Sequence, residues 1–278
     1  MDAPSLRRDF GTEDWALILG GSSGFGLATA QKLAAHGMSV CVVHRDLRSA
    51  TERVERGFDA VRAAGGAFLS INTDALSAAG RAEILRQLRA ARGERGKVKL
   101  LLHSIALGNL RPLVHASEPA LRLGEEELAG TLHAMGTSLV TWVQALLDEE
   151  SFAPAASVVA LTSEGARLAL PSYAAVGAAK ACLESLVRSL AVELAPRGLR
   201  CNAIQAGVTD TPALRRIRGH EQLLERAALR NPCGRRTLPE DVANAIYLLA
   251  LPEARWINGA VIPVDGGESI AALPITED

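Results

Sequence analysis

Gly20-Gly21-Ser22-Ser23-Gly24-Phe25-Gly26 decides the fold, because this stretch follows a short apolar run and opens an amphipathic segment. The preceding run, Trp15–Leu19, is typical of a buried strand, and Gly24–His36 is typical of a helix. Glycines at such a junction let the backbone turn tightly and approach a pyrophosphate, while free N–H groups at the helix start attract negative charge. Tight turns also use glycine for steric reasons alone. The strand–loop–helix context favours a dinucleotide site made by Gly20, Ser22, Ser23, Gly24, Phe25 and Gly26.

The alternation of short apolar runs with longer amphipathic segments continues to the C-terminus. The expected strands are Trp15–Leu19, Ser39–His44, Ala67–Asn72, Leu100–Ser104, Ser157–Thr162, Arg200–Gln205 and Val261–Val264. The expected helices are Gly24–His36, Ala50–Ala64, Gly80–Ala91, Glu125–Asp148, Tyr173–Pro196 and Pro239–Ala250. Strands that are apolar throughout favour a parallel sheet with both faces covered, and crossovers between such strands are right-handed. The sequence therefore predicts an α/β, Rossmann-like, doubly wound parallel sheet of about seven strands with helices on both faces.

The composition is that of a globular protein with a large core: 278 residues, 48% hydrophobic and 22% charged. We expect one domain over 1–278, with residues 1–13 as an N-terminal extension, because no linker-like segment divides the chain. The formal net charge of −1 gives no basic excess that would indicate nucleic acid. Since no apolar run is long enough for a bilayer and the N-terminus is polar, we expect no membrane association and a cytoplasmic location.

The four cysteines are widely spaced and form no C-x-x-C pair, which favours buried, reduced thiols over disulfides. The six histidines do not cluster at the spacing of metal ligands. We therefore expect no metal.

The end of the second predicted strand indicates which dinucleotide is bound. An acidic residue at this tip accepts hydrogen bonds from the ribose of NAD, whereas a basic residue pairs with the 2′-phosphate of NADP. His44 and Arg45 occupy the tip, which favours NADPH and makes NADH the less favoured cofactor. Asp46 counts against this preference, and Arg45 could equally be a solvated surface charge. Beyond the third strand, Asp74 and Ala75 are placed to contact the adenine, although Asp74 could instead cap the next helix.

A tyrosine and a lysine share one face of a strongly apolar helix that begins near Pro171. Tyr173 and Lys180 are seven residues apart, which is nearly two helical turns. A lysine there is expected to lower the pKa of the phenol and to hydrogen-bond a nicotinamide ribose. A core tyrosine beside a lysine that extends to solvent is the alternative. Because tyrosine is scarce and Tyr173 follows a strand end, the pair favours a nicotinamide-dependent oxidoreductase.

Together these elements resemble the short-chain dehydrogenase/reductase family over essentially the whole chain. The matches are the glycine loop, Asn202-Ala203-Ile204-Gln205-Ala206-Gly207 with Thr209 and Thr211, and Val264-Asp265-Gly266-Gly267. Leu19 stands in place of the usual Thr and Ala206 in place of the usual Pro, and neither change removes a catalytic group. The resemblance implies that the cofactor is also lined by Ser104, Ile105, Ala106, Lys180, Gly207, Val208, Thr209 and Thr211.

The spacing of the pair resembles a divergent branch of this family, the enoyl-acyl-carrier-protein reductases. Ordinary members place the tyrosine four residues before the lysine, where this chain has Val176. Two segments also match the branch: His103-Ser104-Ile105-Ala106 and Gly266-Gly267-Glu268-Ser269-Ile270. Ser163 stands where the commonest subtype has a second tyrosine, and the glycine loop is short. Both features are similar to the less common, NADPH-using subtype of bacterial enoyl reductase.

The longer spacing suits conjugate reduction, in which hydride reaches the β-carbon and negative charge appears on a more distant carbonyl oxygen. A shift of three helical positions moves the phenol by roughly 4.5 Å along the axis. Tyr173 is therefore expected to stabilise the enolate, and Lys180 to orient NADPH. Ser163 is expected to supply a second hydroxyl, or else to cap its strand end. The asparagine that assists ordinary members aligns with Met135.

The leading hypothesis is NADPH-dependent reduction of the trans-2 double bond of an enoyl thioester in fatty-acid biosynthesis. There are two alternatives. One is a carbonyl or dienoyl reductase of specialised metabolism, and the other is a cofactor-sensing regulator. Residues from about 207 to 232 should cover the substrate, an acyl-carrier-protein or CoA thioester, and their arginines would suit either acidic partner. A solvated helix face is the alternative for each of Arg215, Arg216, Arg218, Arg230, Arg235 and Arg236. The resemblance also implies a homotetramer built through the long helices.

Overall fold

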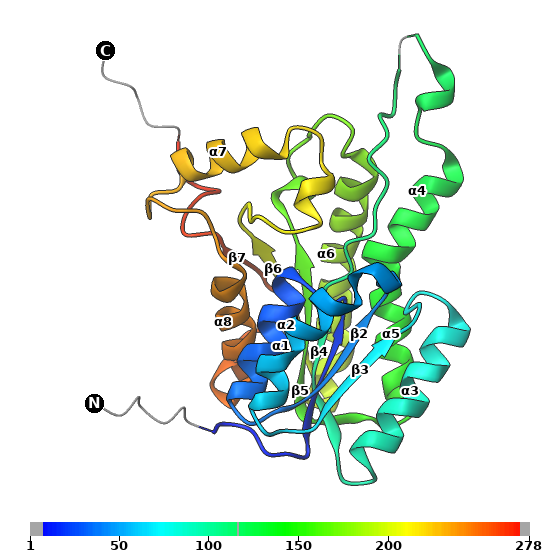
Figure 1. Ribbon diagram of the computed structural model, residues 1–278, viewed down its shortest axis with the longest axis vertical. Helices are drawn as coiled ribbons and strands as arrows, with labels where there is room; N and C mark the ends of the chain where they lie inside the picture. The colour runs from blue at the N-terminus through cyan, green and yellow to red at the C-terminus, as the bar shows by residue number, and fades with distance from the viewer. Residues whose placement is uncertain (1–7, 116, 273–278) are drawn as a thin grey trace.

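The computed structural model describes residues 8–115 and 117–272, which form an open, twisted sheet between two layers of helices (Figure 1). Within these residues seven strands lie in the order β3-β2-β1-β4-β5-β6-β7, and every neighbouring pair is parallel. The strands are β1 (Asp14–Leu19), β2 (Ser39–His44), β3 (Phe68–Asn72), β4 (Lys97–His103), β5 (Phe152–Thr162), β6 (Arg200–Ala206) and β7 (Val261–Val264). The predicted fold class is confirmed, and β2 and β7 have the predicted bounds.

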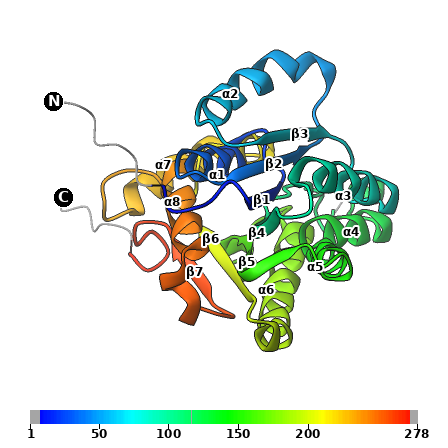
Figure 2. The same cartoon turned by 90° about the horizontal axis from the view of Figure 1, so that it is seen from below.

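Helices cover both faces of the sheet, as the second view shows (Figure 2). One layer holds α1 (Gly24–Ala35), α2 (Thr51–Ala63) and α8 (Pro239–Ala250), and the other holds α3 (Ala78–Arg92), α5 (Ser138–Asp148) and α6 (Ala174–Leu194). The fold also contains α4 (Glu125–Leu132) and α7 (His220–Arg230). Part of the predicted N-terminal extension, residues 1–7, lies outside the described residues.

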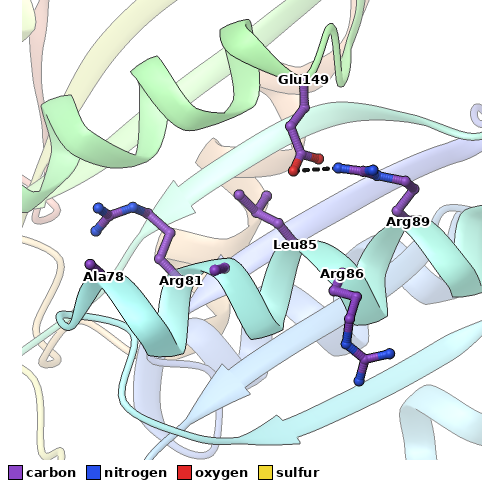
Figure 3. A pocket seen from close by; sticks show the side chains of 7 residues that line it. Ala78, Arg81, Leu85, Arg86, Arg89 and Glu149 are labelled. Atoms are coloured by element: carbon purple, nitrogen blue, oxygen red, sulfur yellow. Dashed lines mark ion pairs between the residues drawn. The ribbon is translucent and has the colours of Figure 1, made fainter.

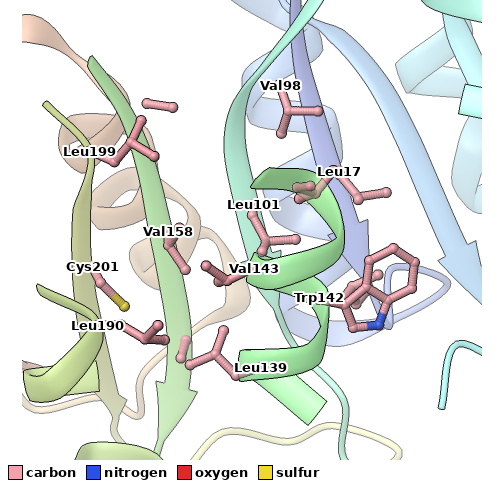
Figure 4. Packing of buried hydrophobic residues seen from close by; sticks show 14 of the residues in the cluster. Leu17, Val98, Leu101, Leu139, Trp142, Val143, Val158, Leu190, Leu199 and Cys201 are labelled. Atoms are coloured by element: carbon pink, nitrogen blue, oxygen red, sulfur yellow. The ribbon is translucent and has the colours of Figure 1, made fainter. Parts of the chain in front are cut away.

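The two layers form because side chains alternate across each buried strand. Leu17 and Leu19 of β1 belong to the cluster under α3, α5 and α6, while Ala16 and Ile18 belong to the cluster under α1, α2 and α8. Trp142 of α5 is fully buried in the first cluster, of which Figure 4 shows it and Leu17 as members. Burying one such side chain contributes on the order of 2 kcal/mol. A shift of a strand by one residue would exchange its two faces, so the apolar residues on both faces favour the observed strand register.

The predicted helical segment Glu125–Asp148 is confirmed, although a π-helical turn that the sequence did not predict, His133–Thr137, lies between α4 and α5. Gly136 lies in this turn, and a Cβ there would approach the carbonyl oxygen of Ala179 on α6 to 3.1 Å. The helix therefore deforms where it packs closely on α6. Such bulges frequently occur at functional sites, and the apolar period of a sequence does not reveal them.

All seven strands are parallel, so their carboxyl ends meet along one edge of the sheet, where open α/β proteins bind ligands. In the described part of the chain, no helix is both long and apolar enough to cross a bilayer. Among those same residues, no group of three or more His, Cys, Asp and Glu side chains could hold a metal ion.

Candidate functional site

The glycine loop turns at the carboxyl end of β1, pressed against the chain that leaves β4. Gly20 has φ of 87°, and a Cβ there would come within 2.5 Å of the carbonyl oxygen of Ser104. A Cβ on Gly26 would overlap the carbonyl oxygen of Gly20. These two positions therefore need glycine, one for its backbone conformation and both for close approach.

The start of α1 fits a dinucleotide pyrophosphate. Ser23 is the N-cap, yet its side chain makes no capping hydrogen bond, and the first turn of α1 carries no acidic residue. The helix therefore presents N–H groups and the positive end of its dipole without a carboxylate of its own. Four residues of the predicted set are half-buried around this start: Ser22, Ser23, Gly24 and Phe25.

The turn after β6 lies against the same helix start. A Cβ on Gly24 would come within 3.2 Å of Thr211 Cγ2, so these two predicted residues face one another. Thr209 Oγ1 donates to the carbonyl oxygen of Gly207 at 2.9 Å, which holds the turn around Val208. The structure thus brings the two ends of the predicted cofactor site together.

At the end of β2, Arg45 is exposed and lies 3.8 Å from the carboxylate of Asp74. Asp46 is held elsewhere, because it accepts from His44 Nδ1 at 3.0 Å and from Arg53 Nη2 at 3.2 Å. Asp46, the residue that counted against the NADPH preference, is therefore already paired with His44 and Arg53. Asp74 does not cap α3, since Ser77 does so by accepting from Gly80 N, but Asp74 Oδ1 accepts from Leu76 N.

The segment after β4 leads from the glycine loop towards Tyr173. Ser104 N donates to the carbonyl oxygen of Leu19 at 2.9 Å, and Ile105 packs in the small apolar cluster that includes Tyr173. Ala106 is exposed, whereas Ala75 after β3 is almost fully buried. The Ala75 carbonyl oxygen accepts from Trp142 Nε1 at 3.0 Å. A cofactor would therefore contact Ala75 through atoms other than this oxygen.

Lys180 lies on α6 and is almost completely buried. Its Nζ donates to the carbonyl oxygen of Leu161 at 2.6 Å. Burial lowers the pKa of Lys180 to about 8, and the carboxylate of Glu184 one turn further along α6 acts in the opposite direction. Glu184 is itself fixed by Thr162 Oγ1, which donates to it at 2.7 Å. Sequence reasoning missed Glu184.

Tyr173 and Ser163 lie together at the carboxyl end of β5. A Cβ on Gly165 would overlap the Tyr173 ring and come within 3.2 Å of Ser163 Oγ. Burial raises the pKa of Tyr173, and the neighbouring Ser163 hydroxyl acts in the opposite direction. The expected lowering of this pKa by Lys180 is therefore wrong, because burial of the phenol outweighs the opposing influence.

Ser163 is not the strand-end cap that was its alternative role. It precedes the 3-10 turn Glu164–Ala166 without a side-chain capping hydrogen bond. Ser163 Oγ is buried and makes no hydrogen bond of good geometry with any described residue. A buried hydroxyl without such a bond is costly unless a ligand satisfies it. Ser172, just before Tyr173, has φ of 60°, a strained conformation of the kind that clusters at functional sites.

The position of the ordinary family tyrosine is closed by apolar packing. Val176 is 4% exposed and packs with Met135 and Ala179. A Cβ on Gly108 would approach Val176 Cγ2 to 2.5 Å and Met135 Sδ to 3.0 Å. Both positions where ordinary members carry polar catalytic groups are therefore filled by aliphatic atoms.

His103, at the end of β4, is a fully buried residue whose role the sequence did not predict. Its Nε2 lies 2.8 Å from Ser138 Oγ, which donates to the Ala134 carbonyl oxygen and so accepts from the ring. Burial, with Lys180 as a secondary cause, lowers the pKa of His103 to about 3. The imidazole is therefore neutral, and it anchors the π-helical turn to the sheet.

The arginines expected to form one basic docking patch are only partly available. Arg215 pairs with Asp210, Arg235 pairs with Asp241, and Arg230 pairs with Glu164 and Glu268. Arg230 contributes to the interior of the site rather than to its outer surface. Three arginines remain exposed without an ion pair to a described residue: Arg216, Arg218 and Arg236.

A hollow of about 430 Å³ lies away from these residues, between α3 and the end of α5 (Figure 3). Arg81, Leu85 and Arg86 line it, and Arg89 closes one end with an ion pair of 2.5 Å to Glu149. None of the predicted site residues contributes to it. Of the cysteines, Cys41 and Cys201 are buried as expected, whereas Cys182 is half-buried and Cys233 is exposed.

A parallel sheet with a glycine loop, an uncapped helix start and a buried lysine on a helix that begins with a tyrosine defines a class of dinucleotide-dependent oxidoreductases. A family model described as Enoyl-(Acyl carrier protein) reductase matches residues 20–269. The chain belongs to the short-chain dehydrogenase/reductase family and is an NAD(P)H-dependent oxidoreductase.

Known relatives are chemically diverse. The chain is 30% identical over 258 residues to a cis-4-hydroxycyclohexanecarboxylate dehydrogenase of Sinomonas cyclohexanicum, covering 91% of this chain and 95% of the relative. It is also 30% identical to the peroxisomal 2,4-dienoyl-CoA reductase of Mus musculus, covering 91% and 82%. Over 120 residues it is 38% identical to an enoyl-[acyl-carrier-protein] reductase [NADH] of Escherichia coli, covering 43% and 46%.

Among solved structures, a short-chain dehydrogenase/reductase from Serratia marcescens superposes with a TM-score of 0.77 at 25% identity. The match covers 95% of this chain and 99% of that one. The comparisons therefore support the fold and the reaction class.

Proposed function

We propose that this protein is an NADPH-dependent reductase of the trans-2 double bond of enoyl thioesters, acting in fatty-acid biosynthesis. One observation carries the proposal: Tyr173, with Ser163 beside it, opens the helix that holds the buried Lys180 seven residues further on, while apolar packing encloses Val176. The other tyrosine, Tyr247, donates to Asp9 at 2.7 Å, well away from this cluster.

The bound nicotinamide would supply hydride to the β-carbon of the substrate. Tyr173, whose pKa is raised by burial, stays protonated at neutral pH and can donate a hydrogen bond to the enolate oxygen. Ser163 Oγ can donate a second such bond, because it has no good partner among the described residues. Lys180, charged below a pH of about 8, would orient the dinucleotide ribose and stabilise the developing negative charge.

NADPH is favoured over NADH because Arg45 is exposed at the tip of β2 with only a loose 3.8 Å ion pair to Asp74, whereas Asp46 accepts closer hydrogen bonds from His44 and Arg53. The substrate is proposed to be carried by an acyl-carrier protein or by CoA, with Arg216, Arg218 and Arg236 available to an acidic or phosphorylated carrier. A homotetramer built through the long helices remains a prediction.

A carbonyl or dienoyl reductase is the second candidate, supported by the dehydrogenase of Sinomonas cyclohexanicum and the 2,4-dienoyl-CoA reductase of Mus musculus, each of which is 30% identical. NADPH oxidation measured with a crotonyl thioester and with an acetoacetyl thioester separates the candidates. We expect turnover with the crotonyl compound only. Turnover with the acetoacetyl compound only would refute the proposal, and a 2,4-dienoyl thioester tests the remaining alternative.

The role of Tyr173 is tested by Tyr173→Phe, with Tyr247→Phe as the matched control. We expect Tyr173→Phe to lower kcat on the order of a hundredfold, as the loss of one oxyanion donor does, while the Kd for NADPH changes little. Tyr247→Phe should retain kcat. Full activity of Tyr173→Phe would show that another group stabilises the enolate.

A further inference from the structure

Arg230, the last residue of α7, reaches across the site and binds two carboxylates from separate parts of the chain. Its Nη2 lies 3.0 and 2.9 Å from the two oxygens of Glu164 and 3.2 Å from Glu268 Oε1. Glu164 directly follows Ser163, and Glu268 follows β7. One guanidinium therefore connects α7, the Ser163 turn and the C-terminal turn of the described chain.

Glu268 extends this connection to the predicted cofactor turn. Its side chain is 2% exposed, and its Oε2 accepts from Val208 N at 3.2 Å. A Cβ on Gly207 would come within 2.9 Å of the same oxygen, so the carboxylate supports the Gly207–Thr209 turn from behind. Burial raises the pKa of Glu268, and Arg230 acts in the opposite direction, which is the effect expected of the counter-ion to a buried carboxylate.

A second contact fixes the same end of α7. Asn231, the residue after Arg230, is buried and donates through Nδ2 to the carbonyl oxygen of Asp265 at 2.7 Å. The Asp265 carboxylate accepts from Gly267 N at 2.9 Å and from Ser269 N at 3.0 Å, which shapes the turn that presents Glu268. The end of α7 is therefore anchored by adjacent residues to one turn.

We infer that Arg230 is a positioning residue that fixes α7 and the Ser163 turn relative to the Gly207–Thr209 turn, through Glu164 on one side and Glu268 on the other. The inference rests on the proposed function in one respect, which is that α7 covers the acyl substrate. The Gly207–Thr209 turn belongs to the predicted cofactor site and Ser163 to the predicted substrate site. Binding of the dinucleotide should therefore order the place where the thioester binds.

Hydrogen–deuterium exchange tests this coupling without any substrate. In the wild-type protein, saturating NADPH should slow amide exchange at residues 207–209 and also at residues 163–168 and in α7. In Arg230→Lys, which keeps the charge but loses the planar guanidinium, NADPH should still protect residues 207–209 and lose most of its effect on the other two segments. Equal protection of those segments in the variant, or none in the wild type, would overturn the inference.

Two further variants separate the role of Arg230 from unfolding of the protein and from the loss of any arginine on α7. Removing Arg230 alone leaves a buried carboxylate unpaired, so the double variant Arg230→Met/Glu268→Gln removes both charges together. It should unfold cooperatively and show the same loss of NADPH-dependent protection as Arg230→Lys. Arg226→Met, at an exposed arginine on the same helix, is the matched control and should exchange like the wild type.

Steady-state kinetics give a second readout. Because hydrogen bonds to charged groups typically change affinity tenfold or more, Arg230→Lys should raise KM for a crotonyl thioester on the order of tenfold. Its kcat and its Kd for NADPH should change much less, since Tyr173 and Lys180 are intact. A fall in kcat with unchanged KM would overturn the inference. If wild-type protein binds NADPH yet reduces no enoyl thioester, the proposed function fails, while the exchange experiment still tests Arg230.

Discussion

Replacing Lys180 with methionine should abolish activity and yet stabilise the protein at neutral pH. Burial lowers the pKa of Lys180 from 10.5 to about 8, which corresponds to about 3 kcal/mol of disfavoured positive charge. Methionine has a similar length and no charge, so it removes this cost. It also leaves the carbonyl oxygen of Leu161 without its donor, which costs about 1 kcal/mol. The free energy of unfolding at pH 7 should therefore rise by roughly 1–2 kcal/mol.

The gain should depend on pH in a defined direction. Below pH 8 the lysine is charged in both the folded and the unfolded protein, so the wild type carries the full cost. Between about pH 8 and 10.5 the folded wild type loses this proton first, so its stability rises with pH relative to the variant. The advantage of the variant should shrink across this interval and be absent above it.

Urea unfolding at pH 7 and at pH 10, at one protein concentration, measures both effects. Lys99→Met is the matched control, because the half-buried Lys99 also donates to a backbone carbonyl, that of Pro154 at 3.1 Å, but through a solvent-exposed hydrogen bond. It should give no stabilisation at pH 7. A Lys180→Met protein that is less stable than the wild type at pH 7 would refute the reasoning. So would a difference in the free energy of unfolding that is the same at both pH values.

Three further variants test other parts of the site. Glu184→Gln removes the carboxylate that raises the pKa of Lys180, so the pH at which kcat/KM falls should move below that of the wild type, and an unchanged pH profile would contradict this role. Arg45→Ala should weaken NADPH binding on the order of tenfold and NADH binding little, as measured by fluorescence titration, and equal losses would exclude a contact to the 2′-phosphate. Gly26→Ala should abolish binding of either dinucleotide and lower Tm, because a Cβ overlaps Gly20 O; normal binding would show that the loop can shift.

The fold could be predicted because its signals are local. Every strand lies within a few residues of its predicted place, since each is an apolar run between polar turns. The π-helical turn could not be predicted in this way, because it arises where Gly136 packs against α6, a contact between segments distant in sequence. The hydrophobic period of Glu125–Asp148 continues through it unchanged.

The site residues could be named because motif and spacing are properties of the chain. The environments of those residues could not, because they depend on burial. Sequence spacing suggests that Lys180 lowers the pKa of Tyr173, whereas desolvation of the phenol raises it. Charge counting groups Arg230 with a basic surface, whereas Glu164 and Glu268 turn it inward from segments that precede and follow it. Glu184 carries no motif, and only the packing of α6 against β5 reveals it.

The contact between Gly108 and Val176 limits how this active site can change during evolution. A tyrosine at Val176 would collide with the chain at Gly108 and with Met135, because those atoms already fill the space around the smaller side chain. A tyrosine in the position of ordinary family members therefore differs from Val176 both in its hydroxyl group and in the space that its side chain needs. A lineage passing between them must first move or shorten the segment that follows β4. A single substitution of Tyr173 would remove the phenol, and a single substitution of Val176 by tyrosine would disrupt the packing against Gly108 and Met135.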